Sequence, residues 1–248
     1  MLEKGYYNMD CLEALKQFPD NFFDLAIVDP PYGGGAKSDA EDVYNGAIQG
    51  RFGGRFEKYI LPNKEIGTHF HGRVRSERYK IGEQKINHWD VAPPKEYFDE
   101  LFRVSKNQII WGGNYFDLPP TRCFLVWRKL TISQSFTMAM CEYAWTSFND
   151  NAKWIEIAPQ GNAKEIRFHP TQKPIKLYTW ILNLYAKPGD KILDTHVGSA
   201  SSLVACHRAG FDFWGFELDP HYYRLSKEWL DVEQRQLTFF NLNKSEAT

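Results

Sequence analysis

The sequence has few cysteines, no long hydrophobic run and no excess of charge of either sign. Its four cysteines lie far apart and form no Cys-x-x-Cys pair or Cys/His ligand spacing, which argues against a disulfide scaffold and predicts no metal site. With 30 Lys and Arg against 31 Asp and Glu, the chain is no uniformly basic coat protein for nucleic acid. No stretch of about 18 apolar residues is present, and the polar first residues are unlike a signal peptide. We therefore expect a cytoplasmic protein with no membrane partner.

Short apolar runs alternate with amphipathic segments along the chain, which is typical of an α/β fold. Strands are expected at residues 5–9, 25–28, 108–111, 124–127, 138–145 (antiparallel), 191–193 and 213–216. Helices are expected at residues 11–18, 95–104, 174–185, 201–209 and from 220 to about 236.

Residues 33–90 interrupt this alternation, because they lack sustained periodicity and are rich in glycine, aromatic and basic residues. Residues 51–85 contain nine Lys and Arg against four Glu, in a chain that is otherwise slightly acidic. Long segments inserted between regular elements are often functional. This basic insert could contact an acidic partner, or it could be a solvated loop without one.

The tetrapeptide Asp29-Pro30-Pro31-Tyr32 directly follows the apolar run Leu25–Val28. Because neither proline can donate a backbone hydrogen bond, the strand must end here, at the edge where open α/β sheets bind ligands. At that edge the Asp29 carboxylate and the Pro30 carbonyl can accept two hydrogen bonds from one amino group. Tyr32 can lie against the ring that bears this amine. The alternative is a plain turn, since paired prolines are common in turns.

A second motif lies far downstream, where residues 191–201 and 213–219 read as strand, small-residue loop, helix, strand and acidic tip. Glu217 follows the loop glycine Gly198 by 19 residues, close to the offset of about 20 at which a carboxylate reaches ribose hydroxyls. The loop has no G-x-G-x-x-G, which disfavours NAD and FAD. A nucleoside cofactor without phosphates remains compatible with it.

Together the two motifs resemble the amino-group DNA methyltransferases that depend on S-adenosylmethionine, with the catalytic tetrapeptide before the cofactor loop as in the β-class. Residues 5–15 are similar to the family's strand and acidic tip near the cofactor adenine, and residues 169–174 to the element before the helix that leads into the cofactor loop. Ala200 stands where a second loop glycine is common. The resemblance implies a class I, Rossmann-like α/β domain spanning residues 1–248 in circularly permuted order. Its mostly parallel, seven-stranded sheet would be flanked by helices, with residues 33–90 as an insert that recognises the target.

The resemblance also implies site-specific methyl transfer from S-adenosylmethionine to the N6 amine of adenine in DNA, since the tetrapeptide begins with Asp rather than Ser. It assigns catalysis to Asp29, Pro30, Pro31 and Tyr32. It assigns cofactor binding to Asp10, Cys11, Thr171, Gln172, Lys173, Asp194, Thr195, His196, Gly198, Ser199, Ser201, Glu217 and Leu218. The DNA contacts expected from the basic insert are Arg51, Arg55, Arg73, Arg75, Arg78 and Lys80.

Three other functions stay open from the sequence. Cytosine-N4 methylation uses the same chemistry, and an inactive DNA-binding or regulatory protein could have the same fold, although Asp29, Pro30, Tyr32 and Glu217 are intact. Methylation of a protein glutamine is disfavoured, because that tetrapeptide usually starts with Asn. The expected partner is double-stranded DNA, with a homodimer and a separately acting restriction endonuclease as open alternatives. Residues 111–116 end another strand at the same edge and form either a wall of the base pocket or a structural turn.

Overall fold

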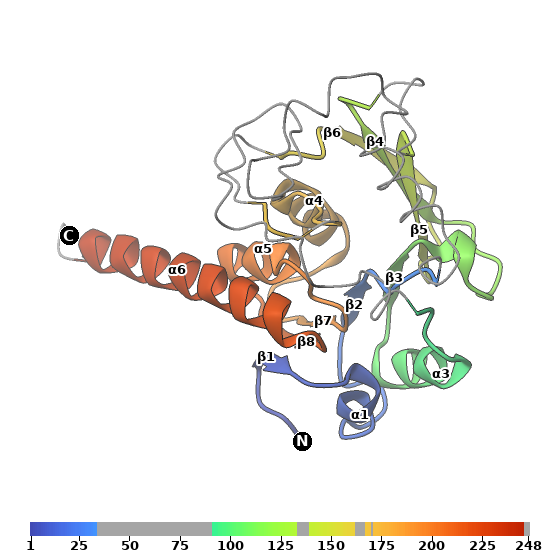
Figure 1. Ribbon diagram of the computed structural model, residues 1–248, viewed down its shortest axis with the longest axis horizontal. Coiled ribbons are helices and arrows are strands. Elements are labelled where there is room, and N and C mark those ends of the chain that lie inside the picture. The colour runs from blue at the N-terminus through green and yellow to red at the C-terminus, as the bar shows by residue number, and fades with distance from the viewer. Residues whose placement is uncertain (34–90, 133–138, 162–166, 170, 246–248) are drawn as a thin grey trace, which may run out of the picture.

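The computed structural model describes residues 1–33, 91–132, 139–161, 167–169 and 171–245, with side chains up to residue 236. Within these residues the strands form one sheet of eight strands in the order β1-β8-β7-β2-β3-β5-β4-β6 (Figure 1). Strand β5 runs antiparallel to β3 and β4, and the other neighbouring pairs are parallel. The strands are β1 (Gly5–Asn8), β2 (Leu25–Val28), β3 (Gln108–Trp111), β4 (Phe124–Lys129), β5 (Cys141–Thr146), β6 (Lys153–Ile157), β7 (Lys191–Asp194) and β8 (Asp212–Glu217).

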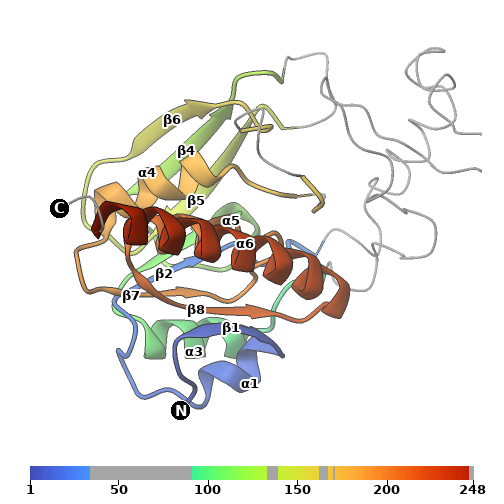
Figure 2. The same ribbon diagram turned by 90° about the vertical axis from the view of Figure 1, so that its left-hand side faces the viewer.

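Helices cover both faces of the sheet, as Figure 2 shows from the side. The helices are α1 (Cys11–Leu15), α3 (Lys95–Val104), α4 (Ile175–Tyr185), α5 (Ser201–Ala209) and α6 (Pro220–Ser245), with a short 3-10 helix η4 at Gly113–Tyr115. In β2, Leu25 and Ile27 belong to the core under α4 and α5, whereas Ala26 and Val28 belong to the core under α1 and α3. Successive strand residues point to opposite faces, so a strand buried on both sides reads as a continuous apolar run.

The predicted α/β fold with a mostly parallel sheet is confirmed, with eight strands in place of seven. All seven predicted strands are present with small differences at their ends, and the additional strand is β6 at one edge of the sheet. Residues 153–157 gave no clear apolar run, because an edge strand is only partly buried: its Trp154 is 64% exposed. Helix α1 is shorter than predicted, ending at Leu15, and α6 is longer, ending at Ser245.

The two ends of the chain meet in the sheet, as the permuted order predicts. Strand β1 pairs in parallel with β8, with Asn8 opposite Glu217, and Asn8 Nδ2 donates a 2.7 Å hydrogen bond to the Glu217 carbonyl. The acidic residue that follows β1, Asp10, therefore lies close to the acidic end of β8. Residues separated by about two hundred positions can thus contribute to one pocket.

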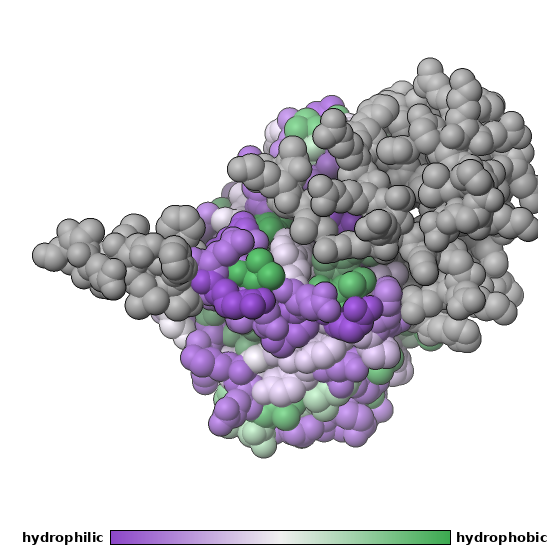
Figure 3. Space-filling view, turned by 60° about the vertical axis from the view of Figure 1, so that its left-hand side comes forward, coloured by the Kyte–Doolittle hydropathy of each residue, from purple (hydrophilic) through white to green (hydrophobic). Residues whose placement is uncertain are grey.

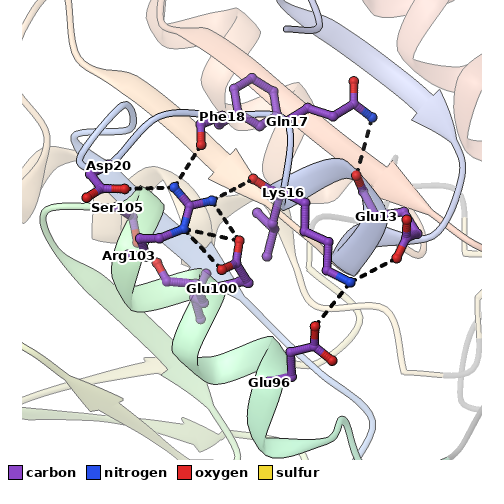
Figure 4. A network of polar contacts seen from close by, with 11 residues as sticks. Glu13, Lys16, Gln17, Phe18, Asp20, Glu96, Glu100, Arg103 and Ser105 are labelled. Atoms are coloured by element: carbon purple, nitrogen blue, oxygen red, sulfur yellow. Dashed lines mark hydrogen bonds and ion pairs between the residues drawn. The ribbon is translucent and has the colours of Figure 1, made fainter.

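A network around Arg103 fixes the segment that leads into β2 (Figure 4). From α3 its guanidinium donates to the backbone carbonyls of Leu15 and Phe18, at 3.2 and 2.9 Å, and to the carboxylates of Asp20 and Glu100. Hydrogen bonding to Arg103 lowers the pKa of Glu100. Because the guanidinium ties α3 to α1 and to the loop after it, the start of β2, and with it the tetrapeptide at its end, has a fixed position.

On the face seen in Figure 3, hydrophilic side chains predominate and hydrophobic ones form small separate patches. Isolated apolar side chains of this kind are ordinary on protein surfaces. Across the described ranges, none of the helices combines the length and the apolar character needed to span a bilayer.

Candidate active site

Five parallel strands place the predicted site residues at one edge of the sheet. Strands β1, β8, β7, β2 and β3 run in the same direction, so their carboxyl ends lie together. Asp10 follows β1, Asp29 follows β2, Gly112 follows β3, Asp194 ends β7 and Glu217 ends β8. The sequence predicted Asp29 and residues 111–116 at one edge and Asp10, Asp194 and Glu217 as cofactor residues, and the structure brings all five positions to the same edge.

Both carboxylate oxygens of Asp29 have partners within the protein. The Tyr32 hydroxyl donates a 2.9 Å hydrogen bond to Oδ1, and the Lys173 ammonium donates to Oδ2. The side chain is 16% exposed. Burial, with a further contribution from the Asp29 charge, raises the pKa of Tyr32, so its hydroxyl stays a donor. Because a carboxylate has about four lone-pair sites, Oδ1 can still accept a hydrogen bond from an incoming amine.

The Tyr32 ring is enclosed by the segment after β3. It stacks on Tyr115 with a centroid distance of 4.7 Å and an angle of 15°, and it meets the edge of Phe116 at 6.2 Å. On another side it contacts Gly112, whose φ of +67° is a left-handed value that favours glycine. The segment predicted as a pocket wall or a turn therefore forms a turn packed against the tetrapeptide. Its contact with a base stays a prediction.

Lys173 contacts Asp29 of the tetrapeptide, although the sequence predicted it among the cofactor-binding residues. Its side chain is 4% exposed, and besides Asp29 it meets Glu142 Oε2 at 3.1 Å. Burial alone would lower the pKa of Lys173, but the charges of Asp29 and Glu142 raise it well above its usual value. Lys129 lies 2.5 Å from the other oxygen of Glu142. Sequence reasoning missed Glu142 and Lys129, because Glu142 lies within one predicted strand and Lys129 two residues after another, and neither pattern indicates anything beyond a strand.

The loop after β7 is held by buried polar contacts. Asp194 accepts hydrogen bonds from the Ser202 hydroxyl and from the His196 backbone N–H, and burial raises its pKa to about 7. Thr195 is hydrogen-bonded through Oγ1 to His196 Nδ1 at 2.9 Å and to the Tyr97 hydroxyl at 2.6 Å. Burial lowers the pKa of His196 to about 4, so this imidazole is neutral near pH 7.

Glu217 closes the loop from the neighbouring strand. Its Oε2 accepts the Gly198 backbone N–H and its Oε1 accepts the Asp219 backbone N–H, both at 2.8 Å. Burial raises the pKa of Glu217. Gly198 has a φ of +55° and Ala200 a φ of +63°. Ala200 thus adopts the conformation for which the family more commonly has glycine, at a cost of about 1–2 kcal/mol.

The tip of β1 contacts this loop. Asp10 caps α1 by accepting the backbone N–H groups of Leu12 and Glu13, at 2.9 and 3.1 Å. Cys11 Sγ lies 3.8 Å from His196 Nε2, and burial raises the pKa of the thiol to about 12, so it stays protonated. The predicted residues from the two ends of the chain are therefore adjacent.

The remaining predicted cofactor residues differ in their surroundings. Ser199 and Ser201 are buried and their hydroxyls are 3.0 Å apart. Gln172 is also buried, and its Oε1 accepts a backbone N–H from four residues earlier. Thr171 is exposed and Leu218 is 64% exposed. The predicted DNA contacts Arg51, Arg55, Arg73, Arg75, Arg78 and Lys80 lie outside the described residues.

Comparisons with known proteins address the family. Residues 110–228 match the family model for DNA methylases of the N6/N4 type. Type II methyltransferase M2.MboI of Moraxella bovis is 24% identical, over 89% of this chain and 85% of its own. The predicted resemblance to the amino-group DNA methyltransferases is confirmed.

Solved structures of such methyltransferases share the fold. TTHA0409 of Thermus thermophilus, solved in complex with S-adenosyl-L-methionine, superposes with a TM-score of 0.52 at 16% identity, covering 94% of both chains. The cytosine-N4-specific PvuII DNA methyltransferase gives a TM-score of 0.52 at 12% identity, covering 95% of this chain and 93% of its own. S-adenosylmethionine, the cofactor predicted from the sequence, is the ligand in the TTHA0409 complex. The matches support an amino-group DNA methyltransferase of the N6/N4 type and do not select one amine.

Proposed function

We propose that the protein is a site-specific DNA methyltransferase that transfers a methyl group from S-adenosylmethionine to the N6 amine of adenine. The observation that carries this proposal is the place of Asp29, at the carboxyl end of β2. It lies between the β7 loop on one side and the aromatic turn after β3 on the other. The tetrapeptide begins with Asp rather than Ser, which in this family favours adenine.

The residues at the ends of β7, β8 and β1 fit a nucleoside cofactor. Glu217 would hold the ribose hydroxyls, because each of its oxygens has a lone pair left after accepting one backbone N–H. Gly198 passes close to the His169 ring, where a Cβ would lie 3.2 Å from it, and its φ of +55° also favours glycine, so the loop presents bare backbone at this position. The neutral His196 and the protonated Cys11 add no charge that would repel a sulfonium.

When bound, S-adenosylmethionine supplies a methyl group already activated by its sulfonium. The exocyclic nitrogen of adenine is a poor nucleophile, because its lone pair is delocalised into the ring. Hydrogen bonds from this amine to the Asp29 carboxylate and the Pro30 carbonyl localise the pair and stabilise the positive charge that develops on nitrogen. The ring of Tyr32 orients the base, and the excess proton leaves from the alkylated amine to Asp29 or to water.

The target amine is hidden in a duplex, so the base must leave the stack, at a cost of a few kcal/mol. Stacking of the base on an aromatic ring offsets about 1–3 kcal/mol of this cost. Contacts between DNA phosphates and the basic insert, residues 33–90, would offset more of it. Double-stranded DNA is thus the proposed partner and the cytoplasm the proposed location.

Nucleoside analysis tests this function. The purified protein is incubated with labelled S-adenosylmethionine and several DNAs, which are then digested and separated. We expect N6-methyladenine, at positions that share one short sequence. Detection of N4-methylcytosine would show that the protein methylates the N4 amine of cytosine instead. Binding of both cofactor and DNA without any methylated base would identify an inactive DNA-binding protein.

A further inference from the structure

A row of buried charges leads from Asp29 into the sheet. Lys173, in the segment before α4, meets Asp29 on one side and Glu142 of β5 on the other. Glu142 in turn meets Lys129 of β4. The row alternates in sign from acid to base to acid to base, and it joins parts of the chain as far apart as 144 residues.

Such a row is costly unless each charge has a partner, because ions lose their hydration on burial. Glu142 Oε2 is buried and has no hydrogen bond, so its contact at this atom is the ion pair with Lys173. The Lys173 ammonium also lies 5.4 Å from the Trp111 ring centroid, which offers a further electrostatic contact. Lys173 is therefore held from several sides, and of its two ion-pair partners among the described residues Asp29 is the one that lies at the rim of the sheet.

We propose that Lys173, held in place by Glu142, is the positioning residue of Asp29. It binds Oδ2 and so turns Oδ1 toward the rim, where Oδ1 accepts from the Tyr32 hydroxyl and would also accept from the target amine during transfer. This role differs from the cofactor contact predicted for Lys173, and it rests on the proposed function.

None of the other described groups that interact electrostatically with Asp29 is a cation that could hold Oδ2. Asp194 at the end of β7 is an acid, and Tyr97 of α3, Tyr178 of α4 and Tyr32 are neutral phenols whose pKa values are raised, in each case mainly by burial. Glu142 from β5 is a second acid. Among the described groups that face Asp29, Lys173 is thus the cation that can fix its orientation.

The test compares Lys173→Met with Glu142→Gln, and uses Lys176→Met as the matched control. Lys176 lies three residues along the chain, but its side chain is exposed. Each variant is measured for its affinity for S-adenosylmethionine, for its single-turnover rate on DNA at one fixed pH, and for the chemical shift of the Asp29 carboxyl carbon by NMR. Asp29→Asn assigns that resonance.

We expect Lys173→Met to lower the transfer rate roughly 10- to 100-fold through misplacement of Asp29, with little change in cofactor affinity. The NMR chemical shift of its Asp29 carboxyl carbon should change, because Oδ2 has lost the Lys173 ammonium. Glu142→Gln should slow transfer several-fold with a smaller change of that shift, because Lys173 is still present but is held less firmly. Lys176→Met should match the wild type in all three measurements.

An Asp29 carboxyl chemical shift unchanged in Lys173→Met would overturn the inference, as would a loss of cofactor affinity larger than the loss of rate. If Lys173→Met does not fold, Glu142→Gln carries the test, and a wild-type rate in that variant would overturn the inference. A wild type that methylates no DNA counts against the proposed function alone, because the carboxyl chemical shift still decides whether Lys173 holds the side chain of Asp29.

Discussion

Gly112 lies directly against the ring of Tyr32, so closely that a Cβ on Gly112 would overlap the ring atoms. The contact joins the end of β3 to the Asp29–Tyr32 tetrapeptide after β2. Gly112 also has a positive φ, so this position favours glycine both for the space it leaves and for its backbone conformation. The position of the Tyr32 ring thus depends on Gly112, which has no side chain that could contact a substrate itself.

Gly112→Ala should displace Tyr32 and lower the rate of methyl transfer about 10- to 100-fold. Gly189→Ala is the matched control, because Gly189 also has a positive φ, of +90°, yet nothing lies within 4 Å of its Cβ position. Both variants should lose about 1 kcal/mol of folding stability from backbone strain. Single-turnover rates and urea unfolding separate the two effects. Equal losses of rate in both variants would show that strain, and not the ring, is responsible.

Asp29→Asn should abolish most of the transfer while S-adenosylmethionine still binds. The amide keeps the shape of the side chain, but it loses the charge that complements the developing positive nitrogen. A loss of about 100- to 1,000-fold in rate is expected for removing one such electrostatic contact. Equilibrium binding and single-turnover assays measure the two quantities. Asp117→Asn, at an exposed acid after the aromatic turn, is the control and should retain the wild-type rate.

The sequence predicts those parts of the site that depend only on a local sequence pattern. Strand β2 and its end at Asp29 follow from four apolar residues and two prolines, and the end of β8 at Glu217 follows from its spacing to Gly198. The row Asp29–Lys173–Glu142–Lys129 could not be predicted, because its members come from four segments and each looks ordinary in its own. Only the sheet order, in which β5 and β4 follow β3, brings Glu142 and Lys129 toward the site. Because these charged groups are largely buried there, each of them needs a partner of opposite charge.

Glu217→Gln should weaken the binding of S-adenosylmethionine about 10- to 100-fold, because hydrogen bonds to a charged acceptor contribute about 1.5–3 kcal/mol. The loop should weaken as well, since Gly198 and Asp219 donate to this carboxylate. Isothermal titration measures the affinity, and Glu228→Gln on the exposed side of α6 is the control. DNA affinity should be unchanged in both variants. An unaltered cofactor affinity in Glu217→Gln would place the ribose elsewhere.

Asp194→Asn should stabilise the cofactor-free protein, and more so at high pH. Burial raises the pKa of Asp194 to about 7, above the value of 3.8 for a free carboxyl group. The native state therefore holds a proton that the unfolded state has released, so wild-type stability falls as the pH rises from about 4 to about 7. The full difference is at most about 4 kcal/mol, and it is constant above that range.

The asparagine variant has no such titration, and its amide can still accept from the His196 N–H and donate to the Ser202 hydroxyl. Its advantage in the free energy of unfolding should thus be small at pH 4.5 and larger at pH 8. Urea unfolding at both values measures it, with Asp212→Asn, at an exposed acid that starts β8, as the control. A difference independent of pH would mean that Asp194 is ionised in the folded protein throughout, with its charge balanced by the hydrogen bonds of the loop.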